Sequence, residues 1–213
     1  MTVLHTEAQL AEAVARLGAI EPRFGGIVTR HGIPPLRRSE PGLRGLLRII
    51  TDQLISLKAG EAIWRRIETE LHPFDAGTIS GMEHMRLMAL GLSGAKARTF
   101  QALSQAVHDG HVEFNELAGA DDDEVLRRLQ KIKGIGPWTA DIYLLSAMGR
   151  ADAWPAGDLA LQAAAQDLFG LPARPGAQDM KRLAEAWRPW RSVAARLLWS
   201  HYRGLKGMTQ SVT

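Results

Sequence analysis

Residues 129–141 read LQKIKGIGPWTAD, and this stretch decides how the chain is interpreted. Gly134 and Gly136 stand one residue apart, a spacing that lets a backbone turn sharply and bring its N–H groups close to an anion. Pro137 suits the first position of a helix, where its missing N–H costs nothing. Such a helix directs its unpaired N–H groups and positive dipole end toward the turn. The stretch therefore predicts a turn and a helix that together can hold an anion.

A second helix is predicted before the turn. Asp121 and Glu124 have the spacing of a capping box at its start. Residues 121–148 then form a unit of helix, hairpin and helix, with Lys131 and Lys133 on either side of the turn. A unit of this kind can hold one DNA phosphate without reading base sequence. We therefore expect the two lysines and the two glycines to contact DNA.

Other uses of a glycine pair have to be weighed against this one. Most glycine pairs are ordinary turns. A dinucleotide-binding loop requires a strand before the glycines, whereas a helix is predicted here. The chain also has no Gly-Lys-Ser/Thr motif for a P-loop. The helical context is what favours the DNA-binding interpretation.

The composition limits the class of protein. The 213 residues are 46% hydrophobic and 23% charged, which is enough for a core in one large domain or two joined lobes. A net charge of +3 permits nucleic-acid binding without demanding it. The lack of cysteine excludes disulfides, zinc–thiolate sites, cysteine nucleophiles and iron–sulfur clusters. The seven histidines show no metal-ligand spacing, and no GxSxG motif indicates another type of hydrolase.

Helical periodicity runs through almost the whole chain, and no segment alternates like a strand, so an all-α fold is predicted. The helices are expected over residues 8–17, 43–57, 59–71, 82–90, 94–108, 121–148 (with the hairpin), 158–170, 178–187 and 192–202. The residues from Gly204 onward are expected to fray. No apolar run is long enough for a transmembrane helix, and the N-terminus does not look like a secretory signal.

Residues 154–158, WPAGD, add a second motif. An aspartate follows a Gly/Pro-rich loop, about one helix and one loop after the hairpin. With these two motifs the chain resembles the helix-hairpin-helix DNA glycosylases, in particular the 3-methyladenine DNA glycosylases of bacteria and yeast that lack an additional N-terminal β domain. The resemblance implies two helical lobes, formed by residues 1–41 with 151–213 and by residues 42–150. It also implies an active-site cleft between the lobes.

The resemblance implies that Asp158 is the catalytic residue. Cleavage of an N-glycosidic bond builds positive charge on the deoxyribose, and a fixed carboxylate stabilises that charge or orients the attacking water. By its local sequence alone, Asp158 is a helix N-cap. The two roles are compatible, because a helix N-terminus favours an ionised carboxylate. Asp152, at the start of the loop, is the alternative, but it lies away from the motif position.

Two tryptophans are candidates for gripping the flipped base. In the bifunctional branch of the superfamily a lysine at the position of Trp138 attacks the sugar, so an indole there implies hydrolysis by water and an intact abasic strand. An indole face also attracts a cationic alkylated purine. Trp190 lies in residues 187–192, WRPWRS, which match the family's Trp-x-Pro-Trp-Arg-Ser segment beside the pocket. The alternatives are core packing for Trp138 and a core formed by Trp187 and Trp190, with solvated arginines. Core or loop packing is expected for Trp64, Trp154 and Trp199.

Gln53 and Leu54 correspond to another part of the family pattern. The resemblance implies that Gln53 lines the cleft and that Leu54 wedges into the gap left by the flipped base. The family usually has glycine before the glutamine, whereas Asp52 stands here and places a carboxylate near the expected DNA path. The alternative is that Leu54 belongs to the apolar stripe of the helix predicted over 43–57.

The hairpin is also implied to bind a monovalent cation. In relatives, backbone carbonyls of this turn coordinate sodium or potassium, and by position these are the carbonyls of Gln130, Ile132 and Ile135. No other cofactor is expected.

The function implied is that of a monofunctional DNA glycosylase of base-excision repair. It would remove alkylated purines such as 3-methyladenine and 7-methylguanine from double-stranded DNA, acting as a monomer in the bacterial cytoplasm and nucleoid or in the eukaryotic nucleus. Two alternatives stay open: a glycosylase for uracil or mismatched adenine, and a non-catalytic helix-hairpin-helix module. Asp158 argues against the module, because a carboxylate facing DNA would repel it.

Overall fold

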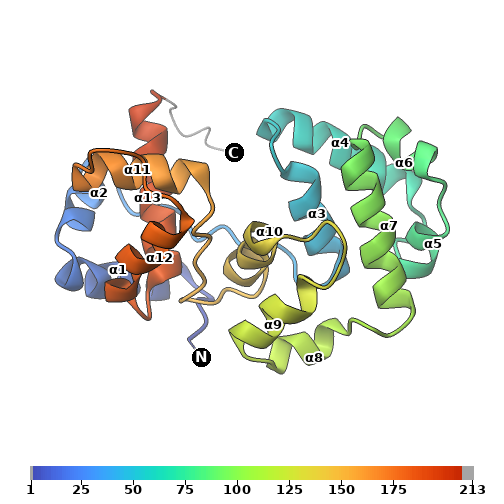
Figure 1. Ribbon diagram of the computed structural model, residues 1–213, viewed down its shortest axis with the longest axis horizontal. Coiled ribbons are helices and arrows are strands. Elements are labelled where there is room, and N and C mark those ends of the chain that lie inside the picture. Colours follow the sequence, from blue (N-terminus) through green and yellow to red (C-terminus); the bar gives the residue numbers. More distant parts are fainter. Residues whose placement is uncertain (1, 208–213) are drawn as a thin grey trace. The chain divides into compact units, whose positions relative to one another are not determined.

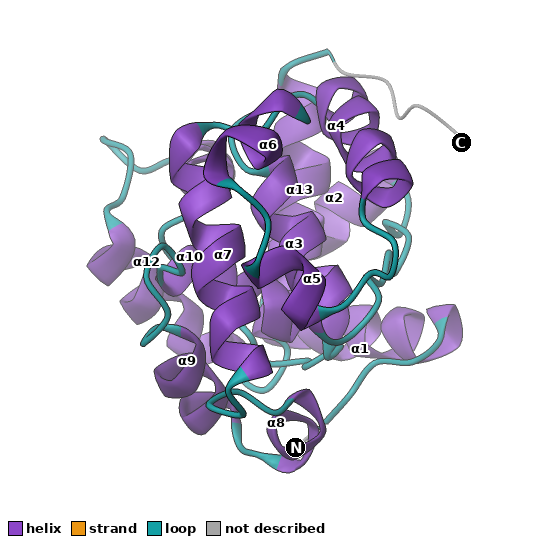
Figure 2. Ribbon diagram, turned by 90° about the vertical axis from the view of Figure 1, so that its right-hand side faces the viewer, coloured by secondary structure: helices purple, strands orange, loops and turns teal. Residues whose placement is uncertain are grey.

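The computed structural model describes residues 2–207. Among these residues the regular elements are helices joined by loops (Figures 1 and 2), together with an isolated β-bridge between Val3 and Arg150. The predicted all-α fold is confirmed. No helix within the described range is long and apolar enough to cross a membrane.

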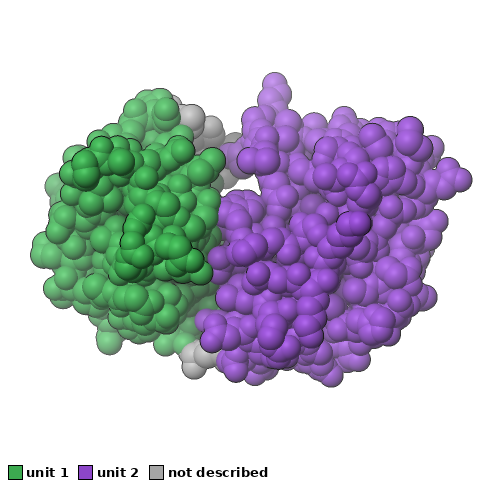
Figure 3. All heavy atoms as spheres, viewed as in Figure 1, with its two compact units in different colours: residues 1–38, 149–213 green, residues 39–148 purple. Residues whose placement is uncertain are grey.

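The chain divides into two compact units, which Figure 3 colours separately. Unit 1 consists of Met1–Arg38 and Gly149–Thr213, and unit 2 consists of Ser39–Met148. The boundaries expected after residues 41 and 150 fall close to those observed after residues 38 and 148.

Unit 1 is built around its last helix. Its elements are α1 (Glu7–Ile20), α2 (Arg23–His31), α11 (Leu159–Phe169), α12 (Ala177–Ala184), the short 3-10 helix Glu185–Trp187 and α13 (Arg191–Leu205). Helix α13 packs against α1, α2 and α11. Trp187 is only 2% exposed, and its ring lies 5.2 Å from Phe24, 5.4 Å from Trp154 and 5.6 Å from Phe169. This aromatic cluster fills the core, as expected for Trp187 and Trp154.

Unit 2 carries the hairpin. Its elements are α3 (Leu43–Asp52), α4 (Leu57–Glu70), α5 (Ala76–Ser80), α6 (His84–Ala89), α7 (Gly94–His108), α8 (Phe114–Gly119), α9 (Asp122–Leu129), α10 (Pro137–Ile142) and the π-helix Tyr143–Ala147. Helix α7 packs against α3, α5 and α6. Its apolar face, including Phe100 and Leu103, is fully buried with Leu46 and Leu47 of α3 in the core of the unit.

The prediction of a single helix over residues 43–57 is wrong. Helix α3 ends at Asp52, and α4 begins at Leu57. Leu54 has a backbone φ of +57°, which a right-handed helix does not contain. Ser56 then starts a new helix, because its Oγ accepts a hydrogen bond from the Ala59 N–H at 3.2 Å. The apolar stripe of the predicted helix continues in the sequence across this break, so helical periodicity alone did not reveal the break.

Other boundaries also differ from the prediction. Helices α2, α5 and α8 were not predicted, and α5 and α8 have only 5 and 6 residues, which is too short for a clear period. Helix α13 extends to Leu205, so the chain remains helical beyond Gly204. The rest of the expected frayed end, residues 208–213, lies outside the described residues.

Candidate functional site

The hairpin of unit 2 joins α9 to α10 through residues 130–136. Asp121 caps α9 by accepting the Glu124 N–H at 2.8 Å. The reciprocal half of the expected capping box does not form: the Glu124 carboxylate pairs with Arg127 and Arg128 instead. Helix α10 begins at Pro137, which occupies the first helical position as predicted.

The two glycines of the hairpin have different roles. Gly134 has a φ of +96°, and a Cβ atom there would lie 1.9 Å from Oγ1 of Thr99. Glycine is therefore required at this position by both conformation and space. Gly136 is the extended N-cap residue of α10, and a Cβ atom there would meet nothing within 4 Å. The sharp turn thus depends on Gly134, and the expected contact of both glycines with DNA stays a prediction.

Apolar and basic side chains alternate along the hairpin. Ile132 and Ile135 are 6% and 4% exposed, whereas Lys131 and Lys133 are exposed. The isoleucines anchor the turn in unit 2, and the lysines remain in solvent, where they can meet a phosphate.

Oxygen atoms of the hairpin backbone are the groups expected to hold a cation. One of them, the Ile132 carbonyl, accepts the Ile135 N–H at 3.0 Å.

The α3–α4 turn lies against the hairpin helix α10. The Gln53 side-chain Nε2 donates to Oγ1 of Thr139 at 2.7 Å, and Thr139 is a buried residue of α10. Leu54, the next residue, is fully exposed, with a relative exposure of 101%. The alternative that Leu54 belongs to a core stripe is therefore wrong.

Trp138 occupies the second position of α10, directly before Thr139. Its side chain is half-buried rather than enclosed. The alternative of a fully buried core residue is not what the structure shows. Unit 2 thus places Trp138 on α10 and Gln53 against the same helix through Thr139, and the hairpin lysines precede this helix in the chain.

Asp158 lies in unit 1 as the N-cap of α11, which confirms its predicted capping role. Its Oδ1 atom accepts the N–H groups of Ala160 and Leu161, both at 2.9 Å. The same oxygen accepts Nε1–H of Trp199 at 3.2 Å. These three donors carry no formal charge, and they fix the orientation of the carboxylate at the start of the helix.

Trp199 is the residue that the sequence did not reveal. It was expected only to pack, yet it reaches Asp158 from α13, 41 positions further along the chain. The contact follows from the packing of α11 against α13. No local motif records that packing, so only the structure could find it.

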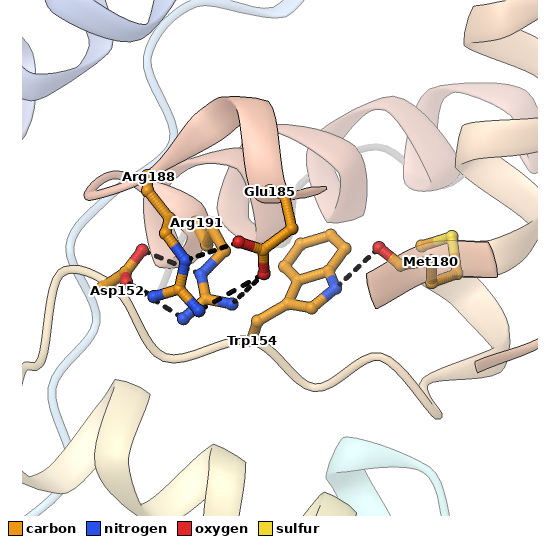
Figure 4. Close-up of polar contacts among 6 residues, drawn as sticks. All are labelled: Asp152, Trp154, Met180, Glu185, Arg188 and Arg191. Carbon is orange, nitrogen blue, oxygen red and sulfur yellow. Dashed lines mark hydrogen bonds and ion pairs between the residues drawn. The ribbon is translucent and has the colours of Figure 1, made fainter. Parts of the chain in front are cut away.

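Asp152, the alternative catalytic residue, has different partners (Figure 4). Its carboxylate pairs with Nη1 of Arg188 at 2.5 Å and with Nε and Nη2 of Arg191 at 2.8 and 2.9 Å. Glu185 joins the same cluster through Arg188 at 2.9 Å, and hydrogen bonding to that guanidinium lowers the pKa of Glu185. The expectation of solvated arginines is therefore wrong for Arg191, whose side chain is 15% exposed.

This cluster fixes the loop to the start of α13. In Figure 4 the Trp154 indole points the other way and donates from Nε1 to the Met180 carbonyl of α12 at 3.1 Å. Trp190 follows as the N-cap residue of α13 and is half-buried, with the Arg16 guanidinium 6.0 Å from its ring centroid. Trp190 therefore does not share the buried core position of Trp187, and its place at a base-binding pocket stays a prediction.

The candidate residues are thus distributed over both units. Unit 1 holds Asp158 and Trp190, and unit 2 holds Gln53, Trp138 and the hairpin. Three or more His, Cys, Asp or Glu side chains grouped to hold a metal do not occur among residues 2–207.

A hairpin between two helices and an aspartate fixed after a Gly/Pro-rich loop are the features of a helix-hairpin-helix protein that acts on DNA. The family model described as the HhH-GPD superfamily base excision DNA repair protein matches residues 47–189. The chain belongs to this superfamily, and the match includes the α3–α4 turn, the hairpin and Asp158.

Relatives and solved structures support the same assignment. The chain is 26% identical over 201 residues to the alkylbase DNA glycosidase-like protein mag2 of Schizosaccharomyces pombe, covering 91% of this chain and 94% of mag2. It is similar to the structure of a Bacillus halodurans DNA-3-methyladenine glycosidase, with a TM-score of 0.76, 26% identity and coverage of 97% and 95%. The S. pombe 3-methyladenine DNA glycosylase Mag1 in complex with abasic DNA shares the fold, with a TM-score of 0.80, 24% identity and coverage of 95% and 99%. Some longer curated bacterial relatives are matched over only about two fifths of their length.

Proposed function

We propose that the protein is a monofunctional DNA glycosylase that hydrolyses the N-glycosidic bond of alkylated purines flipped out of double-stranded DNA. The observation that carries the proposal is Asp158. Its carboxylate is fixed at the N-terminus of α11 by two backbone N–H groups and the Trp199 indole. It occupies the loop position at which the family pattern has its catalytic aspartate.

The chemistry follows from what a fixed carboxylate stabilises. The bond between sugar C1′ and the base nitrogen breaks, and its electron pair leaves with the base. The sugar then carries positive charge, which the Asp158 carboxylate stabilises electrostatically. Water forms the new bond to C1′ and gives up a proton. Because the three donors hold the carboxylate before the reaction begins, little reorganisation is needed in the transition state.

The base is proposed to be held by unit 2. A purine methylated at N3 or N7 is cationic, and the half-buried indole of Trp138 offers it an electron-rich face. Gln53 supplies polar atoms close by. No amine is present at position 138 to form a Schiff base with the sugar, so hydrolysis leaves an intact abasic strand. The names of the relatives support alkylated bases as the substrate class.

DNA is proposed to be held at the hairpin. Lys131 and Lys133 meet phosphate, and the dipole of the helix that follows adds to the attraction. The carbonyls of Gln130, Ile132 and Ile135 would hold a sodium or potassium ion there. Ile132 can still contribute, since a carbonyl oxygen has two lone pairs and one internal donor uses only one. We propose that the protein acts as a monomer, in the bacterial nucleoid or the eukaryotic nucleus.

The test is base release from DNA treated with a methylating agent. We expect the purified protein to release free methylated purine, detected by chromatography, while the strand stays intact until alkali cleaves the abasic site. Borohydride added during the reaction should trap no covalent adduct. Binding without release would favour the non-catalytic module. Release of uracil or mismatched adenine alone would favour the other alternative.

A further inference from the structure

One lysine outside the proposed site contacts the backbone of the α3–α4 turn. Lys96 is on the first turn of α7, where Ser93 caps the helix by accepting the Lys96 N–H at 3.3 Å. The Lys96 Nζ atom donates to the carbonyl of Thr51 at 2.7 Å and to the carbonyl of Gln53 at 2.6 Å. One ammonium group therefore binds two carbonyls on either side of the end of α3.

These contacts suit the chemistry of a helix C-terminus. The last carbonyls of a helix have no partner within the helix, and they form its negative end. An ammonium group there makes charge-assisted hydrogen bonds, which are stronger than neutral ones. Lys96 is half-buried, and this burial lowers its pKa, although the nearby Asp52 carboxylate opposes the effect. The ammonium group is thus bound to the backbone of the unit at two points.

The segment that Lys96 holds is conformationally unusual. Leu54 has a φ of +57°, a region that residues with a side chain rarely adopt, and its side chain is fully exposed. Such a conformation persists only when the surroundings fix it. Here the Gln53 carbonyl is held by Lys96 and the Gln53 side chain is held by Thr139 at 2.7 Å. The residue before Leu54 is therefore fixed at two points.

Asp52 fixes the other side of the same turn. Its Oδ2 atom accepts from Nε of Arg48 at 2.8 Å, and Arg48 also bonds Glu61 of α4 at 3.0 Å. Gly60 of α4 gives the carboxylate room, because a Cβ atom there would lie 2.2 Å from the Asp52 Oδ1 atom. The Asp52 carboxylate, expected near the DNA path, is thus paired with Arg48 within the protein, and its place relative to DNA stays a prediction.

We propose that Lys96 is a positioning residue that holds the α3–α4 turn so that Leu54 projects into the duplex when the damaged base is flipped out. The proposal rests on the proposed function for the role of Leu54. The hold of Lys96 on the turn is independent of it. Nothing in the proposed chemistry at Asp158 uses Lys96, and the Gln53 side chain is held separately by Thr139. The main effect of Lys96 should therefore be on opening the duplex.

The test compares Lys96→Met with Lys58→Met. Lys58 is an exposed lysine at the start of α4, next to the same turn, so both variants lose one positive charge. Single-turnover base release is measured at saturating protein, with the methylated base either in a duplex or in a single strand. We expect Lys96→Met to slow release from the duplex about tenfold, as for loss of a hydrogen-bonded charge, and release from the single strand less than twofold. Lys58→Met should match the wild type on both.

A double-mutant cycle shows whether Lys96 acts through Leu54. If it does, Lys96→Met should slow the Leu54→Ala protein no further. Equal losses on duplex and single strand, a full further loss in the Leu54→Ala protein, or a result equal to that of Lys58→Met would overturn the proposal. Lys96→Gln, whose amide can still donate to one carbonyl, serves if Lys96→Met does not fold, and it should lie between the wild type and the tenfold loss.

Hydrogen exchange separates this proposal from the proposed function. If the wild type releases no base, the proposed function fails, but the hold on the turn is still measurable. We then expect the amides of residues 53–56 to exchange at least about tenfold faster in the lysine variant than in the wild type, with the amides of α7 unchanged. Unchanged exchange in the turn would overturn the positioning role.

Discussion

Two aspartates at opposite ends of one loop, Asp152 and Asp158, are held by different groups. Asp152 is bound by the guanidinium groups of Arg188 and Arg191 at 2.5–2.9 Å. Asp158 is bound at Oδ1 by two backbone N–H groups and the Trp199 indole at 2.9–3.2 Å. The arginines pair with the charge of Asp152, whereas the helix N-terminus and the indole fix the orientation of the Asp158 carboxylate.

This difference distinguishes a carboxylate that stabilises the fold from one that is proposed to take part in catalysis. The ion pairs of Asp152 with two arginines fix the loop to the start of α13. Because the arginines balance the negative charge, little electrostatic attraction remains for a cationic substrate. The Asp158 carboxylate is oriented by N–H donors at the start of a helix, where a negative charge is favoured and can stabilise a cation. The same residue type, six positions apart, thus serves stability at one end of the loop and is proposed to serve catalysis at the other.

Removing the Asp158 charge should give the largest effect. Asp158→Asn keeps the size of the side chain and most of its capping ability, but it removes the charge that stabilises the cationic sugar. We expect single-turnover base release to slow by about 10²–10³-fold. Binding of methylated duplex, measured by anisotropy, should be kept or become tighter. A rate equal to that of the wild type would leave Asp158 as a helix cap only.

Removing a single donor to Asp158 should have an intermediate effect. Trp199→Phe keeps the ring but loses the N–H that bonds Oδ1 at 3.2 Å. With the two backbone donors still present, we expect a loss of about tenfold in single-turnover rate. The matched control is Trp154→Phe, because Trp154 donates to the Met180 carbonyl and does not contact Asp158. Equal rate losses in both variants would show that the indole acts through packing.

Asp152→Asn tests the other side of the comparison. The change weakens the ion pairs to Arg188 and Arg191, and we expect the free energy of unfolding to fall by about 1–2 kcal/mol, or roughly 2–8 °C in Tm. Base release at a temperature where the variant is folded should stay within about twofold of the wild type. Thermal denaturation and single-turnover assays measure the two effects. A rate loss as large as that of Asp158→Asn would contradict the assignment of the two carboxylates.

The hairpin lysines should show the smallest effect, and it should appear in binding alone. Lys131→Ala or Lys133→Ala removes an exposed charge, so undamaged and methylated duplexes should both bind more weakly. The slope of log affinity against log salt should decrease by about one for each phosphate that the variant no longer binds. Titrations at several salt concentrations measure this slope. An unchanged slope would place the phosphate-binding group elsewhere.

Much of the fold was predictable because its signals are local. Helical periodicity identified the long helices, and Pro137 and Asp121 marked two helix starts that the structure confirms. The α3–α4 turn was missed, since its apolar stripe runs on through Leu54 while the backbone leaves the helix there. A left-handed leucine depends on contacts from α7 and α10, which are distant in sequence.

The candidate site divides in the same way. The capping role of Asp158 was readable from its own loop, because the carboxylate and its donors are neighbours in sequence. The partners that distinguish Asp158 from Asp152 were not readable, since Trp199, Arg188 and Arg191 are brought to the loop by the packing of α13. Roles that depend on the DNA itself, such as those of Trp138 and Trp190, stay predictions.

The most direct test of the account uses a duplex that carries an abasic-site analogue with a protonated nitrogen in the sugar ring. This analogue resembles the cationic sugar of the transition state, and a neutral tetrahydrofuran site is its control. The account predicts that wild type and Asp152→Asn bind the cationic site more tightly than the neutral one, and that Asp158→Asn loses this preference. An equal preference for the cationic site in Asp158→Asn and the wild type would contradict the claim that the Asp158 carboxylate stabilises the sugar cation.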